Sequence, residues 1–460
     1  MDAPAPLASL AELCAAPVTP AERAAAVRPM ADTLGVMLAG LADPRAADLA
    51  ATLGLSAEPG RARLPGSDLH GAASDVALMA GFAAHLLDFD DDETEVAMAH
   101  LSAPVLGAAL ALALAARAET PVAMLLDGYV TGCRMMLALG SMANPALYRA
   151  GWHATSALGS FGAAAAAARL LGLSPARAAE ALGLAASGAG GPRGAFGGEG
   201  KPLQVGLAAA NGLRAAELAA AGWTAAPGAL FGARGLLGRM TGGALAPLRK
   251  PQAFPPPGFV TKLFPSCTAT HAAVAELLAL RPRMTAPPAE ILCAVDPFVP
   301  AILIPGLPAG PDAGRFSLAY CLAVAARTGV LGPEAFEAAA FDADGPRDPE
   351  IRALMARVRV TADESLPRGP SGIATGAVVT LTAPDGTRLT GRREAAPGSA
   401  AAPLTDSQLA EKFAACLAPM ARPSEARALW QRLLSPTDFP SAGALLDALP
   451  LALTDRKDPR

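Results

Sequence analysis

From the start of the chain to residue 255, apolar residues recur every three or four positions, in segments separated by Gly, Pro and polar residues. This spacing places apolar side chains on one face of an α-helix. Aromatic residues make up only 4% of the chain, against 52% hydrophobic residues, so alanine supplies much of the apolar character. Alanine favours helices and packs poorly on a pleated sheet, which counts strongly against an all-β fold. We predict helices over 71–87, 104–118, 121–140, 157–171, 175–187 and 203–221.

Two of these helices have recognisable starts. Ser174 precedes Pro175, and Thr120 precedes Pro121. Ser or Thr at the N-cap followed by Pro at the first helical position is a common way to begin a helix. We therefore expect Ser174 and Thr120 to be the N-caps.

The pattern changes after the Pro-rich stretch Pro251–Pro257. Short β-like runs at 291–295, 358–361, 377–383 and 388–392 alternate with expected helices at 315–328, 333–340 and 347–356. The turn Pro384-Asp385-Gly386 between the last two runs predicts a hairpin. A linker at 395–403 returns to helical sequence at 406–418 and 423–434.

These patterns predict a mainly α protein with a large helical domain, a smaller α+β lid domain inserted into it, and a C-terminal helical return. We expect the helical domain over 1–258, the lid over 259–395 and the return over 396–460. The Pro-rich stretch and the 395–403 linker would act as hinges for the lid.

The net charge and the positions of the cysteines indicate which partners and which cellular compartment to expect. The formal net charge is −4 without any basic run, which excludes a nucleic-acid partner of the usual electrostatic kind. The six cysteines are far apart and form no metal-binding pair, as expected for reduced thiols in the cytoplasm. The first twenty residues lack the basic start of a signal peptide. The uncharged segment 97–116 contains His, Ser and Pro and is mostly Ala, so we predict a buried helix and no membrane span.

Lysine is scarce, with five residues among 37 basic ones, so a lysine in an unusual loop is a candidate for chemistry. Lys201 follows the segment 188–200, which has seven glycines in thirteen residues. Ala195 and Pro202 stand where a Walker A loop needs Gly and Ser or Thr, so this is no phosphate loop of that kind. We expect a flexible loop that closes on an anionic ligand and becomes ordered only with it; a mobile surface loop is the alternative.

The densest polar cluster lies between two apolar helical stretches and contains two histidines and six carboxylates (His85, Asp88, Asp90, Asp91, Asp92, Glu93, Glu95 and His100). An EF-hand is excluded because positions 93 and 99 do not carry the required Gly and Glu. Three interpretations stay open: a divalent-metal site, a solvated acidic loop, and an active-site loop in which a carboxylate orients His100 or takes a proton itself.

Two further constellations hold candidate residues. His153 precedes a helix of very small residues and could point into a pocket or simply cap the helix. In the segment 262–271, Cys267 and His271 are four residues apart, the spacing of a thiol nucleophile with an imidazole base. No orienting group or oxyanion hole is apparent, so we favour Lys262 and Cys267 lining a polar pocket at the junction of the two domains.

Five blocks in this order carry a resemblance to a known family. They are GFAAHLLDFDD with HLS (81–91 and 100–102), WHAT before GSFGAAA (152–165), the segment from Lys201 to GWT (201–224), KLFPSCTATH (262–271) and FSLAY (316–320). In these blocks the chain resembles the MmgE/PrpD family, which includes 2-methylcitrate dehydratases, cis-aconitate decarboxylases and iminodisuccinate epimerases.

The resemblance implies a helical domain with an α+β lid, a homodimer, no metal or organic cofactor, and a site in the cleft between the domains. On this basis we assign catalytic roles to His100, Asp88, Lys262 and His153, and substrate contacts to Lys201, Cys267, Tyr320, Asp92 and His271. The chain departs from the family in its longer acidic stretch with Asp92, in Leu101 after His100, and in Gln204 and the loop before Lys201.

The family's reactions share the development of carbanionic charge beside a carboxylate, which fixed cations must stabilise. We hypothesise that Lys201, Lys262 and His153 hold substrate carboxylates while His100 or Asp88 moves the proton. The expected function is a cofactor-independent lyase on a small polycarboxylate, first as dehydratase of a 2-methylcitrate-like hydroxy acid. Decarboxylation of a cis-aconitate-like acid, epimerisation next to a carboxylate, a metal-dependent lyase and a non-catalytic carboxylate-binding dimer are the alternatives.

Overall fold

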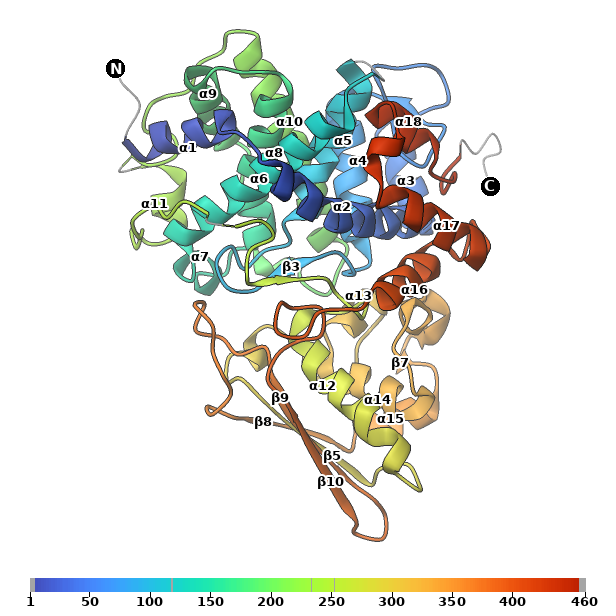
Figure 1. Cartoon of the computed structure of the whole chain (residues 1–460). Helices are drawn as coiled ribbons and strands as arrows, with labels where there is room; N and C mark the ends of the chain where they lie inside the picture. The colour runs from blue at the N-terminus through green and yellow to red at the C-terminus, as the bar shows by residue number, and fades with distance from the viewer. Residues whose placement is uncertain (1–4, 117–118, 233, 252, 455–460) are drawn as a thin grey trace.

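The computed structural model describes residues 5–116, 119–232, 234–251 and 253–454. Helices form most of the upper part in Figure 1, and a four-stranded sheet lies with its own helices in the lower part. The fold is therefore mainly α, as the sequence predicts. The end of the expected helix 104–118 and residue 252 of the expected hinge lie outside the described residues.

The upper part is built on α4, α5, α8 and α10, which pack against one another at its centre. α2 and α6 flank them, and the C-terminal helices return beside α2 and α5. The helices of this part are α1 (Ala5–Ala15), α2 (Pro20–Leu41), α3 (Pro44–Thr52), α4 (Ala73–Leu86), α5 (Ser102–Ala116), α6 (Val122–Ala143), α7 (Ala146–Arg149), α8 (Ala154–Leu170), α9 (Pro175–Ala185), α10 (Gly200–Ala220), α11 (Leu236–Met240), α16 (Asp406–Leu417), α17 (Pro423–Leu433) and α18 (Ala442–Asp447).

Small residues let the central helices approach closely. A Cβ atom at Gly212 of α10 would lie 2.3 Å from the carbonyl oxygen of Ser160 in α8, and one at Gly206 would lie 2.4 Å from that of Leu78 in α4. No side chain fits in either place without moving a backbone. The alanine-rich composition thus becomes a tightly packed helical core, and α10 is fixed on two sides.

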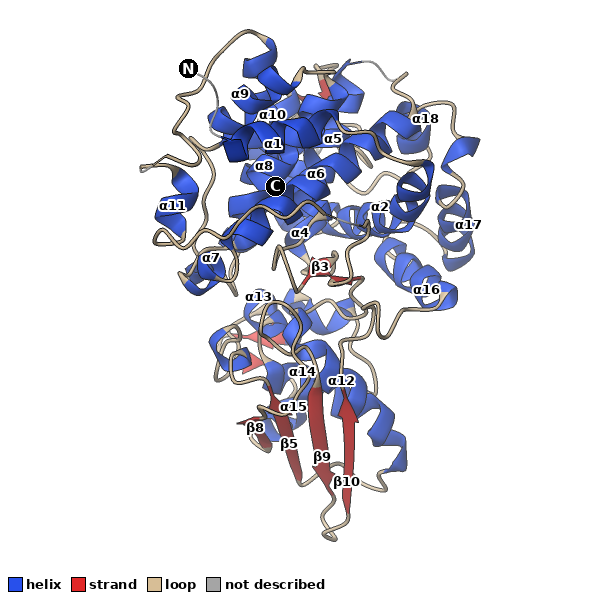
Figure 2. Ribbon diagram, turned by 60° about the vertical axis from the view of Figure 1, so that its left-hand side comes forward, coloured by secondary structure: helices blue, strands red, loops and turns tan. Residues whose placement is uncertain are grey.

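The lower part contains a mixed sheet of order β10-β9-β5-β8, in which β5 and β8 run parallel and the other pairs antiparallel. α12 packs on β9 and β10, and α14 packs on β8 (Figure 2). The strands are β5 (Glu290–Val295), β8 (Val358–Ala362), β9 (Ala377–Thr382) and β10 (Arg388–Arg393), and the helices are α12 (Thr268–Leu280), α13 (Pro311–Arg315), α14 (Leu318–Thr328) and α15 (Pro349–Met355).

Two hydrophobic cores accompany these two parts. One gathers buried residues from positions 7–259 and 409–453, and the other gathers residues from positions 264–381. This separation supports the division at residues 259 and 395, which we propose as the domain boundaries. Short two-residue strands, β3 (Asp92–Glu93) and β4 (Phe259–Val260), pair where the chain leaves the helical part.

Most local expectations agree with the structure. The six expected helices of the first part are present, Ser174 caps α9 by accepting from the Arg177 N–H, and β9 and β10 form the expected hairpin. Thr120 was wrongly expected to be an N-cap: Pro121 takes that position, without a side-chain cap. The Thr120 hydroxyl instead donates back to the Ala113 carbonyl.

Two helices expected in the lower part differ from the structure. The segment 315–328 is interrupted, because Ser317 caps α14 and ends the preceding helix at Arg315. The segment 333–340 forms two short 3-10 helices, Pro333–Phe336 and Ala338–Ala340, which extended Glu337 separates. The first of them begins at a proline, and neither continues as an α-helix.

Among the described helices, α6 is long and apolar enough to cross a membrane by length and composition alone. Its most apolar window is 83% buried inside the protein, as in the core helix of a globular fold. The expected buried helix at 97–116 corresponds to α5, whose bounds are shorter.

We predict that Gly212→Ala destabilises the protein by roughly 2–4 kcal/mol, because the added methyl group collides with the α8 backbone. The matched control is Gly238→Ala in α11, where the nearest atom to an added Cβ is 3.9 Å away. Chemical denaturation should show a large loss for the first variant and no loss for the second. Equal stabilities would contradict the close packing of α10 on α8.

Candidate active site

A hollow of about 750 Å³, its open mouth included, lies between the two parts of the molecule. Both parts contribute to its lining, so neither part alone forms it. The lining residues used below are Asp88, Asp92, His100, His153, Phe196 and Lys201 from the upper part, and Lys262, Cys267 and Phe316 from the lower part.

The turn that follows α4 supplies the acidic side of the site. His85 lies in the last turn of α4, and Asp88 then adopts a left-handed backbone with a φ of +50°. Such a conformation is unfavourable for a residue other than glycine and needs supporting contacts. Asp88, Asp90 and Asp91 are all buried, with at most 3% of each residue exposed.

Two lysines converge on the Asp88 carboxylate. Lys201 Nζ lies 2.6 Å from Oδ1, and Lys262 Nζ lies 3.1 Å from Oδ2. Burial alone would raise the pKa of Asp88, but the two ammonium groups hold it well below its usual range. Asp88 is therefore a bound carboxylate that fixes both lysines. It is poorly suited to take a proton, contrary to the role suggested for it from the sequence.

Lys201 makes a second contact, to the imidazole of His85. Its Nζ lies 2.6 Å from His85 Nε2, while His85 Nδ1 lies 2.9 Å from Asp90 Oδ2. Burial, together with Lys201, lowers the pKa of His85 to about 4, so the ring is neutral at pH 7. We therefore place the proton of His85 on Nδ1, which donates to Asp90, and the accepting lone pair on Nε2.

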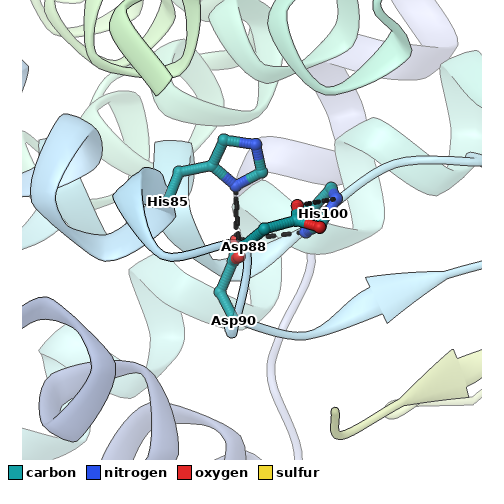
Figure 3. Close-up of side chains that lie close together, drawn as sticks. All are labelled: His85, Asp88, Asp90 and His100. Carbon is teal, nitrogen blue, oxygen red and sulfur yellow. Dashed lines mark hydrogen bonds and ion pairs between the residues drawn. The ribbon is translucent and has the colours of Figure 1, made fainter. Parts of the chain in front are cut away.

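His100 faces both carboxylates of the turn. Its Nδ1 lies 3.2 Å from Asp90 Oδ2, and its Nε2 lies 3.8 Å from Asp88 Oδ1. Figure 3 shows these side chains gathered at one point, with His85 and His100 approaching the two aspartates. His100 also lines the hollow, so its ring lies within reach of a bound ligand while the two carboxylates orient it.

The same four residues, His85, Asp88, Asp90 and His100, offer ligand atoms within 4.8 Å of one another, a spacing that would suit a metal ion. The ammonium of Lys201 already donates to His85 Nε2 and Asp88 Oδ1, two of the groups such an ion would need. A second ammonium, that of Lys262, lies against the other oxygen of Asp88. The residues therefore fit a pair of lysines better than a divalent ion, because the two ammonium groups would repel it.

His153 presents an accepting nitrogen to the hollow. Its Nδ1 lies 2.9 Å from Gln204 Oε1, and the Gln204 amide nitrogen donates to Pro192, which fixes the amide orientation. Burial, followed by Lys201, lowers the pKa of His153 well below its usual value. Nε2 is buried and has no hydrogen-bond partner among the described residues. A neutral ring with a free lone pair accepts a hydrogen bond and carries no charge for an anion, so the expected role of holding a carboxylate does not fit its resting state.

Both ammonium groups retain donors for a ligand. Lys201 donates N–H groups to His85 and to the Asp88 carboxylate, and Lys262 donates one to the Asp88 carbonyl while forming an ion pair with its carboxylate. An ammonium has three N–H groups, so each lysine has at least one left for an anion. The rings of Phe196 and Phe316 lie 5.4 and 5.2 Å from Lys201 Nζ and shield it from water.

Asp92 and Cys267 also line the hollow, where the sequence led us to expect them. Asp92 is held by the β3–β4 pairing opposite Val260. Burial raises the pKa of the Cys267 thiol to about 12, and nearby Asp88 acts in the same direction. Because this keeps the thiol protonated, Cys267 is not a nucleophile in this site.

Two expected substrate contacts, Tyr320 and His271, lie outside the lining of the hollow. Tyr320 is packed in the lower core, where its hydroxyl donates to the Ala335 carbonyl. The His271 Nε2 lies 3.1 Å from the Ser266 carbonyl oxygen, and burial lowers the pKa of the ring to about 3. Both side chains are buried in the lower part, so the structure does not bring them to the hollow with the other predicted site residues. The Cys267–His271 dyad that we considered but did not favour gains no support from this arrangement.

Sequence reasoning gave no role to four residues that shape the site: His85, Asp90, Phe196 and Phe316. His85 and Asp90 were visible in the polar cluster, but their shared position behind the lysines depends on the turn at Asp88. The two phenylalanines had no sequence signal beyond their position beside Lys201 and at the start of the FSLAY block.

Family models match the chain over nearly its whole length. Residues 8–248 match the MmgE/PrpD N-terminal domain, and residues 264–434 match the MmgE/PrpD C-terminal domain. The chain belongs to the MmgE/PrpD family. The two matches meet between residues 248 and 264, close to where the buried residues divide between the two cores.

Two curated relatives of this MmgE/PrpD protein are cis-aconitate decarboxylases. The chain is 28% identical to that of Mus musculus over 283 residues, which is 57% of this chain and 55% of the relative. It is 38% identical to that of Homo sapiens over 151 residues, or 32% of this chain and 31% of the relative. The matched regions thus span about half and one third of these relatives.

A pH-dependent stability follows from Asp91. Burial, followed by repulsion from Asp90, raises its pKa to about 7, although the Leu101 and Ser102 N–H groups point at its carboxylate. The folded state then binds this proton more tightly than the unfolded state does. The stability that the proton confers is full below pH 4 and is lost as the pH rises to about 7.

We predict that wild-type protein loses roughly 3 kcal/mol relative to Asp91→Asn between pH 4 and pH 7, because the variant cannot ionise there. Denaturation midpoints of both proteins across this range measure the difference, and groups common to both cancel. Parallel pH curves for the two proteins would show that Asp91 does not carry the raised pKa.

Proposed function

We propose that this protein is a cofactor-independent lyase acting on a small polycarboxylate. One observation supports this most: Lys201 and Lys262 converge from the two parts of the molecule on Asp88, each with at least one N–H group left for the hollow. Fixed donors in a cleft shielded from water stabilise the charge that develops beside a carboxylate, at about 3 kcal/mol per donor. The cis-aconitate decarboxylase relatives also support a lyase that acts on a small acid.

In this proposal the substrate carboxylates take the free N–H groups of Lys201 and Lys262. The neutral His153 offers Nε2 as the base that removes a proton from the carbon next to a carboxylate. His100, between Asp88 and Asp90, carries a proton to the leaving group. Asp88 holds the two ammonium groups in place throughout and does not transfer the proton.

Three reactions remain candidates, and a separate observation favours each of the first two. Dehydration of a 2-methylcitrate-like hydroxy acid begins with proton removal, for which the unpaired Nε2 of His153 is suited. Decarboxylation of a cis-aconitate-like acid is favoured by the names of the two relatives. Epimerisation next to a carboxylate needs the same base. A dimer that binds carboxylates without turnover is the remaining alternative.

We also propose a homodimer in the cytoplasm. Leu203 and Leu207 lie one turn apart on α10 and are 36% and 50% exposed, which suits a contact with a second copy of the chain. The six cysteines are free, as in a reducing compartment.

Product analysis distinguishes the reactions. Protein freed of metals with a chelator should convert one of citrate, 2-methylcitrate or cis-aconitate without added cofactor. A new double bond seen by ultraviolet absorbance indicates dehydration, and released CO₂ indicates decarboxylation. Loss of turnover on chelation that added metal restores would contradict the cofactor-independent proposal, and binding without any product would favour the carboxylate-binding dimer.

We predict that Lys262→Met lowers kcat/KM at least about 100-fold, because one fixed donor to the developing charge is lost. The control is Lys250→Met, the same change at an exposed lysine away from the hollow. Steady-state kinetics on the converted substrate measures both. Near-wild-type kinetics of Lys262→Met would remove Lys262 from the catalytic set.

His153→Gln tests the base. The variant keeps a polar side chain but has no nitrogen able to accept a proton at neutral pH, so kcat should fall about 100-fold or more if dehydration starts with proton removal. Exchange of the substrate α-proton with deuterated water provides a second measurement. Unchanged exchange and turnover would assign the base to another group.

A further inference from the structure

Three consecutive backbone carbonyls in the turn after α4 each accept a hydrogen bond from a cationic side chain. Arg315 Nε lies 3.0 Å from the Leu87 carbonyl oxygen, Lys262 Nζ 2.9 Å from that of Asp88, and Lys412 Nζ 2.9 Å from that of Phe89. The donors come from α13, from the segment before α12 and from α16. Three distant parts of the chain thus hold one turn.

Lys412 is the member of this set that no role has yet explained. Only 5% of it is exposed, and it is absent from the lining of the hollow. Its ammonium lies 2.7 Å from Asp32 Oδ2 of α2 and 4.4 Å from the centre of the Phe89 ring. In a chain that uses five lysines, a buried one paired with a carboxylate and aimed at a backbone carbonyl calls for a reason.

The turn needs such support because of its shape. Asp88 has the left-handed backbone noted above, and the residues around it direct two carboxylates to different partners. The Asp88 side chain meets the lysines of the hollow, while the Asp90 side chain meets His85 and His100. Phe89 lies between them, so a shift of its carbonyl moves both carboxylates.

We propose that Lys412, neutralised by Asp32, is a positioning residue for the candidate active site. By holding the Phe89 carbonyl it fixes the turn that sets Asp88 against the lysines and Asp90 against the two histidines. Arg315 performs the same task at the Leu87 carbonyl from the lower part. The test has two arms: one measures kinetics, and the other measures the NMR signals of the histidines. The kinetic arm rests on the proposed lyase function, whereas the spectroscopic arm does not.

The spectroscopic arm uses the five histidines of the chain, labelled with ¹³C at the imidazole and assigned by single substitutions. In Lys412→Met, the signals of His85 and His100 should move, because their partner Asp90 is displaced. Those of His70 and His271, which bond the Asp68 and Ser266 carbonyls, should not move. Unmoved signals for His85 and His100 would overturn the proposal, whatever the substrate is.

Lys412→Met leaves Asp32 buried without a counter-charge, which lowers stability. A second variant must therefore show that the moved histidine signals do not come from this loss of stability. The double variant Asp32→Leu/Lys412→Met removes both charges and should recover most of the thermal midpoint. The His85 and His100 signals should stay displaced, and kcat should remain at least tenfold reduced with KM within about threefold of wild type. Full recovery of kcat together with the midpoint would show a structural role only and overturn the proposal.

The matched control removes a buried carboxylate elsewhere. Asp127 of α6 is 8% exposed and accepts from Arg23 and Arg169, at 2.6 and 3.1 Å. Asp127→Leu should lower the thermal midpoint while leaving the His85 and His100 signals and kcat unchanged. Equal displacement of those signals in Asp127→Leu would mean that any loss of stability disturbs the turn, and would overturn the specific role of Lys412.

Discussion

The sharing of one buried carboxylate by two lysines from different parts of the chain determines the site. Asp88 would be costly to bury as an ion by itself, and each lysine would be costly to bury without a counter-charge. Together, Lys201 and Lys262 keep Asp88 ionised, and Asp88 keeps their ammonium groups at the hollow. Because Lys201 belongs to α10 and Lys262 to the segment before α12, this interaction also joins the two parts of the molecule.

The pKa values of neighbouring acids in the same turn shift in opposite directions because their partners differ. Asp88 and Asp90 face lysines or imidazoles, and these partners hold their pKa values below the usual range against the effect of burial. Asp91 accepts from the Leu101 and Ser102 N–H groups and has no ion pair among the described residues, so burial, followed by the neighbouring Asp90, raises its pKa to about 7. Sequence order places these acids together, but the direction of each side chain decides its charge.

Much of the fold could be predicted from the sequence. Apolar spacing located the helices around α8 and α10, Ser174 marked the start of α9, and the Pro-Asp-Gly turn located the β9–β10 hairpin, because these signals are local. The scarcity of lysine pointed to Lys201 and Lys262, and the polar cluster with the family resemblance pointed to Asp88 and His100; the structure brings all four to one hollow. Tyr320 and His271 lie outside that lining, because a polar residue in a matching block can equally serve the core.

What the sequence could not provide is the direction of side chains across long separations. The tautomers of His85 and His153 depend on their contacts with Asp90 and Gln204. The contact of Lys412 with Phe89 joins positions 323 residues apart. Such pairs depend on packing between helices, and a single sequence contains no local pattern that predicts them.

The close fit of α10 between α4 and α8 has a consequence for how this protein can vary. Lys201 lies in the first turn of α10, whose glycines lie against the backbones of two neighbouring helices. Contacts on both sides of α10 therefore fix the position of the Lys201 ammonium. A shift of α10 along its axis would carry the cation with it. New substrates are therefore more easily accommodated by exchanging residues in the loops that face the hollow than by moving the helix that carries its charge.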